Sequence, residues 1–136
     1  MKYNGIIQKK LALLTEYLVK LRIELTDIKF SQFNDNWAMQ RMTERSLQVM
    51  VEIIIDISER IIAIENAGPV ASAGQAIEKL VELKVIATCD PYVDMVKFRN
   101  LIVHRYEIIE SELLYTIASN KLTDFERFIR ELDNCE

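Results

Sequence analysis

LQVMVEIIIDISERIIAI, residues 47–64, carries an apolar residue at nearly every third or fourth position, which is the spacing of one helix face. Ile53, Ile55 and Ile62 lie off that face, so the predicted helix is apolar on more than one side. Because a monomer of four or five helices has few partners to cover so wide a surface, we expect part of it to form a subunit interface. The main apolar stripe consists of Leu47, Met50, Val51, Ile54, Ile57, Ile61 and Ile64.

The rest of the chain has the pattern of further helices. Asp35 is placed to cap the helix that contains residues 47–64, and Ser72 begins a capping-box pattern. Asp90-Pro91 has the form of a cap followed by a first-turn proline. We expect residues Ser31 to Asn36 to separate the first two helices. The predicted helices cover residues 3 to about 30, 36 to about 66, 73 to about 85, a segment that starts at Asp90-Pro91, and roughly 111 to 133.

Composition supports a helical class. The 136 residues include only 3 Gly and 2 Pro, while 50% are hydrophobic and 28% are charged. Sandwiches and barrels need frequent turn residues, and disordered chains are poor in apolar residues, so both classes are excluded. We predict one all-α domain over residues 1–136, an up-and-down bundle of four to five helices.

The net charge and the cysteine content limit the classes of function that this chain can have. A net charge of −4 disfavours a broad, sequence-independent grip on nucleic acid, although it permits a local basic site. Cys89 and Cys135 are too few and too far apart for a disulfide scaffold, so we expect them to be reduced. We find no export signal and no apolar run of about 20 residues, so we expect a cytoplasmic protein without membrane contact.

Most catalytic templates are excluded by the residue inventory. One histidine and two distant cysteines give no zinc site and no Cys-His pair, and three isolated glycines build no phosphate loop. We therefore expect no metal and no cofactor. A polar line on the second predicted helix, which is either a solvated face or the lining of a dimer cleft, consists of Arg41, Arg45, Gln48, Glu52, Asp56 and Glu59.

KFRNLIVHRY, residues 97–106, gathers the single imidazole, three cations, an amide and a phenol. On residue type alone, His104 is most often a packed or capping residue, Arg99 a surface charge and Tyr106 a packed ring. On a regular helix, Arg99 and His104 point about 140° apart, whereas Asn100 and His104 share a face. For Arg99 and His104 to meet at one point, the helix must end or distort near Val103 to Tyr106, or the two residues must come from different chains at a dimer axis.

The Arg99-x4-His104-x-Tyr106 spacing resembles the signature of HepT-like toxins in the HEPN superfamily. Residues 43–48, TERSLQ, with Glu52 and Ile55-Asp56, are similar to the second helix of that family, and the resemblance extends over nearly the whole chain. It implies a HEPN-like homodimer that cleaves RNA without metal and acts as a toxin. It also implies a partner, a minimal nucleotidyltransferase antitoxin that adenylylates the motif tyrosine.

The resemblance also implies residue roles. His104 would be the general acid and base, Arg99 the clamp on phosphate, Asn100 a supporting residue, and Tyr106 the modification target. The resemblance also favours the interpretation that the polar line on the second predicted helix faces a dimer cleft and not solvent. Two alternatives remain: a non-catalytic module that binds a nucleotide or a protein, and a helical scaffold.

Overall fold

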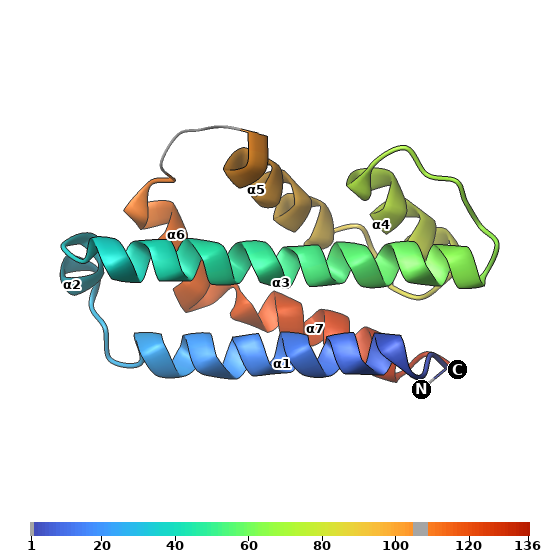
Figure 1. Cartoon of the computed structure of the whole chain (residues 1–136), viewed down its shortest axis with the longest axis horizontal. Coiled ribbons are helices and arrows are strands. Elements are labelled where there is room, and N and C mark those ends of the chain that lie inside the picture. The colour runs from blue at the N-terminus through green and yellow to red at the C-terminus, as the bar shows by residue number, and fades with distance from the viewer. Residues whose placement is uncertain (1, 105–108) are drawn as a thin grey trace.

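A computed structural model describes residues 2–104 and 109–136, and within these residues the chain is helical without strands. Figure 1 shows the helices packed lengthwise and crosswise around one long central helix. Their bounds are α1 Ile6–Leu25, α2 Phe30–Asn34, α3 Trp37–Ile64, α4 Ala73–Glu82, α5 Tyr92–His104, α6 Ser111–Asn120 and α7 Leu122–Asp133.

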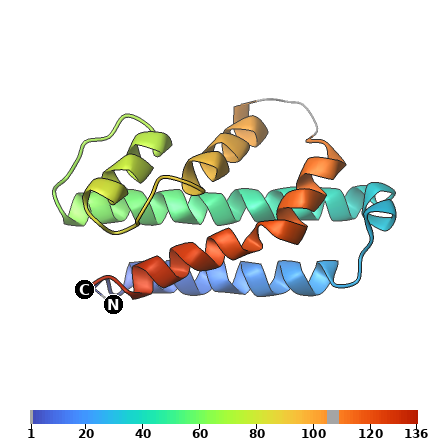
Figure 2. The same ribbon diagram turned by 180° about the vertical axis from the view of Figure 1, so that it is seen from behind.

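The central helix is α3, which contacts α1, α2, α4, α5 and α6. Helix α1 runs alongside it, α4 and α5 lie on its other side, and α6 and α7 cross behind, as the reverse view shows (Figure 2). The two chain ends meet, since the Lys2 amide donates to the Cys135 carbonyl at 2.7 Å. Buried residues of all seven helices join one cluster, so every described element contributes to a single core.

Most of the wide apolar surface of α3 is covered by the same chain, whereas Ile64, which the sequence pattern places in the main apolar stripe, is 59% exposed. Ile53 and Ile55 are 7% exposed and Ile62 is 4% exposed, which means that neighbouring helices bury all three. A central helix has neighbours around most of its circumference. The sequence predicted four or five helices, fewer than the structure describes, and so it underestimated how many helices cover α3. These isoleucines therefore give no reason for a subunit interface, and the homodimer itself stays a prediction.

Two predicted boundaries in the first third of the chain are corrected. Helix α1 ends at Leu25, where Asp27 adopts the left-handed backbone conformation with φ of 60°, and residues 30–34 form α2 instead of a break. Asn36, not Asp35, caps α3, because its side-chain oxygen accepts the Met39 amide at 2.9 Å. The predicted cap at Ser72 is confirmed, since its Oγ accepts the Gln75 amide at 3.1 Å.

The last predicted helix is two helices. The segment expected at 111–133 divides at Lys121, with α6 before it and α7 after it. The change of direction lets both segments bury their apolar residues, which include Leu114 on α6 and Phe125, Phe128 and Leu132 on α7. Helix α4 also ends earlier than expected, at Glu82 instead of Val85.

The start of α5 is fixed by a carboxylate on α7. Glu131 accepts the Tyr92 hydroxyl at 2.5 Å, the Ala87 amide at 2.7 Å and the Arg127 Nε at 3.1 Å. Tyr92 is fully buried, and burial raises the pKa of its hydroxyl above the usual range, with the Glu131 hydrogen bond adding to the effect. This network anchors the helix that carries the candidate site residues.

Candidate functional site

Helix α5 carries the three candidate residues that the structure describes. Arg99 follows Tyr92 and Val96 by seven and three residues, so it extends the buried stripe of the helix, and it is half-buried. Asn100 and His104 lie on a different stripe, in which Asn100 is half-buried and His104 is exposed. Arg99 therefore lies on the side of α5 that faces the core, and His104 lies on the side that faces solvent.

Helix α5 spans Tyr92–His104 without a break, so Arg99 and His104 point about 140° apart within one chain. No side-chain hydrogen bond joins Arg99, Asn100 or His104 to another described residue. Tyr106 lies outside the described residues, so its role as the modification target stays a prediction.

Arg99 has hydrogen-bonding capacity to spare. Its Nε is buried, and no residue that the structure describes accepts a hydrogen bond from it. A buried donor without an acceptor costs about 1–3 kcal/mol, more for a charged group. An anionic oxygen delivered by a ligand would satisfy this donor, which fits the predicted role as a phosphate clamp.

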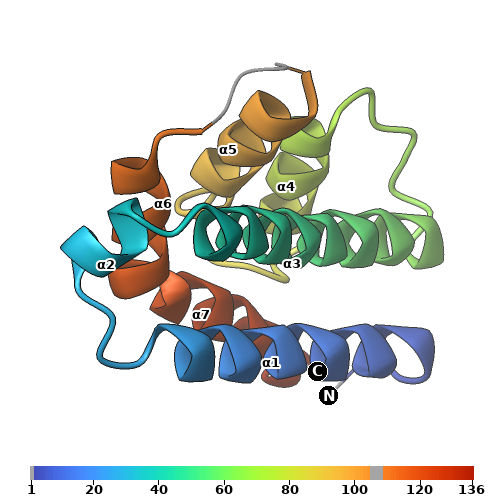
Figure 3. The same cartoon turned by 60° about the vertical axis from the view of Figure 1, so that its left-hand side comes forward.

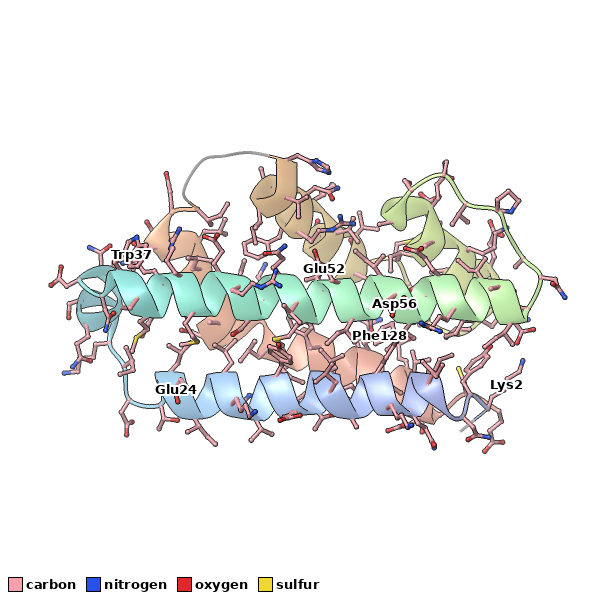
Figure 4. All side chains as sticks on the ribbon, viewed as in Figure 1. Lys2, Glu24, Trp37, Glu52, Asp56 and Phe128 are labelled. Carbon is pink, nitrogen blue, oxygen red and sulfur yellow. The ribbon has the colours of Figure 1, made fainter. Side chains whose placement is uncertain are left out.

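The members of the polar line on α3 differ in their exposure and in their polar contacts. Arg45 and Glu59 are exposed, whereas the other members of the line are half-buried. Asp56 lies 2.5 Å from Lys10 Nζ on α1, and this hydrogen bond, helped by Arg60, lowers the pKa of the Asp56 carboxyl. Gln48 donates to Glu52 at 3.2 Å, one turn along α3. Figure 4 shows Glu52 on the side of α3 toward α5 and Asp56 on the side toward α1.

Arg41 differs from the rest of the line in a way that the sequence pattern did not reveal. Its Nη1 lies 3.0 Å from Glu44 Oε2, and both side chains are largely covered. Its Nε and Nη2 are buried without an acceptor among the described residues. A periodic pattern of polar residues predicts which side of a helix they share, but it does not predict which of them keep unused donors.

An apolar cavity lies beside the candidate residues without including them. Its volume is about 270 Å³, and it is lined by α3, α5, α6 and α7 side chains that include Val51, Phe98 and Phe125. Arg99, Asn100 and His104 do not line it. Within the described residues, no group of three or more His, Cys, Asp or Glu side chains is placed to hold a metal ion, and no helix combines the length and apolar character needed to cross a membrane.

Comparison with known proteins gives a consistent set of similarities. The family model described as Ribonuclease HepT-like matches residues 7–132. The mRNA nuclease HepT of Shewanella oneidensis is 27% identical over 128 residues, covering 93% of this chain and 95% of the relative. The tRNA nuclease HepT of Aphanizomenon flos-aquae is 23% identical over 131 residues, covering 95% of this chain and 88% of the relative.

A solved structure extends the similarity to three dimensions. The tri-AMPylated Shewanella oneidensis HEPN toxin in complex with MNT antitoxin superimposes with a TM-score of 0.87 at 26% identity. The alignment covers 96% of this chain and 98% of the toxin chain. The all-α, HEPN-like fold class expected from the sequence is therefore confirmed.

Proposed function

The chain belongs to the HepT-like ribonuclease family, and from that premise we propose that it is a metal-independent endoribonuclease, the toxin of a toxin–antitoxin pair. The similar proteins of known function are mRNA and tRNA nucleases, which makes RNA the substrate class. The observation that carries the proposal is the position of Arg99 and His104 on the last turns of α5, within the span matched by the family model. Residues 1–136 act as one domain, and the site of action is the cytoplasm.

His104 and Arg99 supply the chemistry. In the cleavage step, an imidazole takes the proton of the RNA 2′-hydroxyl while the hydroxyl oxygen attacks the neighbouring phosphorus. A protonated imidazole gives a proton to the leaving 5′-oxygen, so the products are a 2′,3′-cyclic phosphate and a 5′-hydroxyl. Arg99 binds the phosphate oxygens and stabilises their added negative charge in the transition state. Asn100 shares the His104 face of α5 and orients the imidazole or the substrate.

Two copies of the chain complete the site. Each chain contains one histidine, whereas the reaction uses one base and one acid. Arg99 and His104 also point in different directions on α5, so one chain alone does not direct both at the same phosphate. A homodimer with a two-fold axis near the end of α5 brings two copies of each residue to one cleft.

A nucleotidyltransferase antitoxin controls the activity. The similar toxin of known structure is AMPylated and bound to an MNT antitoxin, which supports a partner of the same kind for this chain. Tyr106, two residues beyond His104, is the acceptor. An AMP group on Tyr106 places a phosphodiester anion and a base next to Arg99 and His104, which blocks the RNA phosphate by charge and by volume.

RNA cleavage in the presence of EDTA tests the nuclease. We expect the wild-type chain to produce cyclic-phosphate ends and His104→Ala to lose cleavage while its circular dichroism spectrum stays unchanged. Arg99→Lys keeps a charge but loses the two parallel hydrogen bonds of a guanidinium, so we expect a large loss of turnover with an intact fold. Undiminished cleavage by His104→Ala would refute the mechanism.

Mass spectrometry tests the regulation. Incubation with ATP and a minimal nucleotidyltransferase antitoxin should add AMP to Tyr106 and abolish cleavage. Tyr106→Phe should stay unmodified and escape inhibition. Tyr115→Phe, which removes a different phenol, is the control and should be modified and inhibited like the wild-type chain. Modification at another residue would refute the assignment of Tyr106. A chain that binds nucleotide or antitoxin but never cleaves RNA would instead be the non-catalytic binding module.

A further inference from the structure

The apolar cavity between α3, α5, α6 and α7 has no part in the proposed cleavage step. Its volume is about 270 Å³, and its wall is aliphatic and aromatic, with the rings of Phe98 and Phe125 among its side chains. Pockets for small ligands are typically about 300–1,000 Å³, mostly apolar, with a few polar groups at fixed places. This cavity lies at the small end of that range, so its size suits one planar ring system.

Four charged side chains also line this cavity. Asp94 and Lys97 come from α5. Lys121 and Asp124 come from the junction of α6 with α7, and Figure 3 shows α6 passing beside α2 into α7 while α5 lies above α3. No ion pair or side-chain hydrogen bond joins any of the four to another described residue. Lys97 and Lys121 are exposed, so their ammonium groups can bind an anion that arrives from solvent.

Lys97 connects the cavity with the candidate catalytic residue. His104 follows Lys97 by seven residues, which is close to two turns, so these two exposed side chains lie on one face of α5. The rise of the helix separates them by about 10 Å. A single strand with its scissile phosphate at His104 can therefore place a neighbouring nucleotide at Lys97 and the cavity.

We infer that this cavity is a subsite for one nucleobase of the RNA substrate, and that Lys97 and Lys121 bind phosphates next to that base. The inference deepens the proposed nuclease function and rests on it. A base has the apolar faces that suit the cavity wall, and the strand carries the anions that two exposed lysines bind. Because the net charge of the chain is −4, local contacts of this kind must provide the affinity for RNA.

The two carboxylates determine which part of a nucleotide enters the cavity. Asp94 and Asp124 repel a phosphate, so the phosphates stay with the lysines and the uncharged base enters. A carboxylate only accepts hydrogen bonds. Adenine and cytosine each carry an amino group that donates to such an acceptor, whereas uracil carries none. The subsite therefore prefers adenine or cytosine to uracil.

Fluorescence anisotropy of short, end-labelled single strands tests the subsite. The strands are 2′-O-methylated, so the wild-type chain can bind them but cannot cleave them. We expect oligo(A) and oligo(C) to bind more tightly than oligo(U). The double variant Asp94→Ala, Asp124→Ala should reduce this difference. In methyl NMR spectra, the Leu101 and Leu113 signals should shift as oligo(A) is added, and the Leu13 signals on α1 should not.

Lysine variants test the phosphate contacts. Lys97→Gln and Lys121→Gln should each reduce the slope of log affinity against log salt by about 0.7, the value for one phosphate contact on a single strand. Lys9→Gln removes the same charge from α1, where Lys9 is exposed and makes no ion pair with a described residue. It is the matched control and should leave the slope unchanged.

A larger side chain in the cavity tests the base contact. Leu113 lines the cavity and is 41% exposed, so a tryptophan at this position can occupy the cavity without disturbing the core. We expect Leu113→Trp to raise the dissociation constant at least about fivefold, the lower end for one base bound against aromatic rings. Leu13→Trp is the matched control, since Leu13 is 42% exposed on α1, and it should bind like wild type. Circular dichroism checks that both variants fold.

The outcomes distinguish this subsite from the nuclease proposal. If RNA binds but the lysine variants keep the wild-type slope, or if Leu113→Trp binds like Leu13→Trp, the subsite is wrong and the nuclease proposal stands. Equal affinities for the three strands would refute the base preference. If Leu113→Trp weakens the homodimer or antitoxin binding and leaves RNA affinity unchanged, the cavity belongs to a protein contact, which also overturns the subsite. If the wild-type chain neither binds nor cleaves RNA, the function and the subsite both fail.

Discussion

Glu131 is one carboxylate that holds three parts of the chain together. It accepts hydrogen bonds from the Tyr92 hydroxyl, the Ala87 amide and the Arg127 guanidinium, so it ties the loop before α5 and the first turn of α5 to α7. The Tyr92 side chain is completely buried, so the loss of its acceptor costs free energy of folding. The network therefore sets the position of α5, and with it that of Arg99 and His104.

Glu131→Ala tests this role. It leaves the buried Tyr92 hydroxyl without an acceptor, so we expect the free energy of unfolding to fall by about 2–3 kcal/mol. Tyr92→Phe removes the donor as well as the need for an acceptor and should cost only about 1 kcal/mol. Urea unfolding followed by circular dichroism measures both. Equal losses for the two variants would show that packing, not the hydrogen bond, fixes α5.

Asp56 gives stability a pH dependence. The Lys10 ammonium lowers the pKa of its carboxyl, so the ion pair stabilises the fold fully above the unfolded-state pKa of about 3.9. The contribution disappears as the pH falls through the lower folded-state pKa. Because the Asp56 side chain is 44% exposed, water screens the pair, and Asp56→Asn should cost at most about 1 kcal/mol at pH 7.

Urea unfolding of Asp56→Asn and wild type from pH 7 to pH 2 measures this effect. The difference between the two proteins should shrink toward the acid end of the range. Glu59→Gln is the control, since it removes an exposed carboxylate of the same helix that makes no ion pair with a described residue. A constant difference across the range would mean that the charge of Asp56 contributes nothing.

At the residue scale, the sequence predicts relations between residues that are close along the chain, but not contacts that tertiary packing creates. The sequence predicts Arg99 and His104 as site residues because their spacing is a motif, and the angle between them follows from helix geometry. The unused donors of Arg41 and the network around Glu131 join side chains whose relation depends on tertiary packing. No spacing along the chain encodes that Tyr92 meets Glu131, 39 residues away.

At the scale of elements, the start of α3 shows how two adjacent cap candidates differ. Asp35 and Asn36 are both good cap residues, but only Asn36 has its side chain on the Met39 amide. Asn36→Ala should therefore lower the free energy of unfolding by about 1 kcal/mol. Asp35→Ala is the matched control, and we expect it to stay within about 0.5 kcal/mol of wild type. A larger loss for Asp35→Ala, measured by urea unfolding, would contradict the assignment of the cap.

Helices with a strong apolar period were predicted well, and short or divided ones were not. The periodic runs that become α1 and α3 place most of their residues correctly. Helix α2 was missed because five residues are too few to show a period. The division at Lys121 was missed because no Gly or Pro marks it, and the apolar residues of α6 and α7 continue in a pattern that one helix could also carry.

At the scale of the whole molecule, the arrangement of the helices decides what an apolar face means. The isoleucines of α3 indicated a second subunit only as long as the bundle was assumed to be small. With α1, α4, α5 and α6 around α3, its off-stripe residues Ile53, Ile55 and Ile62 are buried by its own chain. The case for two subunits therefore depends on the site: one histidine per chain, and an Arg99 that points away from His104 on one helix.

Mixing two inactive variants tests whether the site is shared between chains. Arg99→Ala and His104→Ala should each be inactive alone. In a mixed dimer, the first chain supplies the one remaining His104 and the second supplies the one remaining Arg99, so a site built across the two-fold axis keeps one imidazole as the base and one phosphate clamp, while water must protonate the leaving oxygen. We expect cleavage to reappear, well below the wild-type rate, after the two variants exchange subunits, and native mass spectrometry to show the mixed dimer. Mixed dimers that form but stay inactive would contradict a site to which one chain gives His104 and the other gives Arg99.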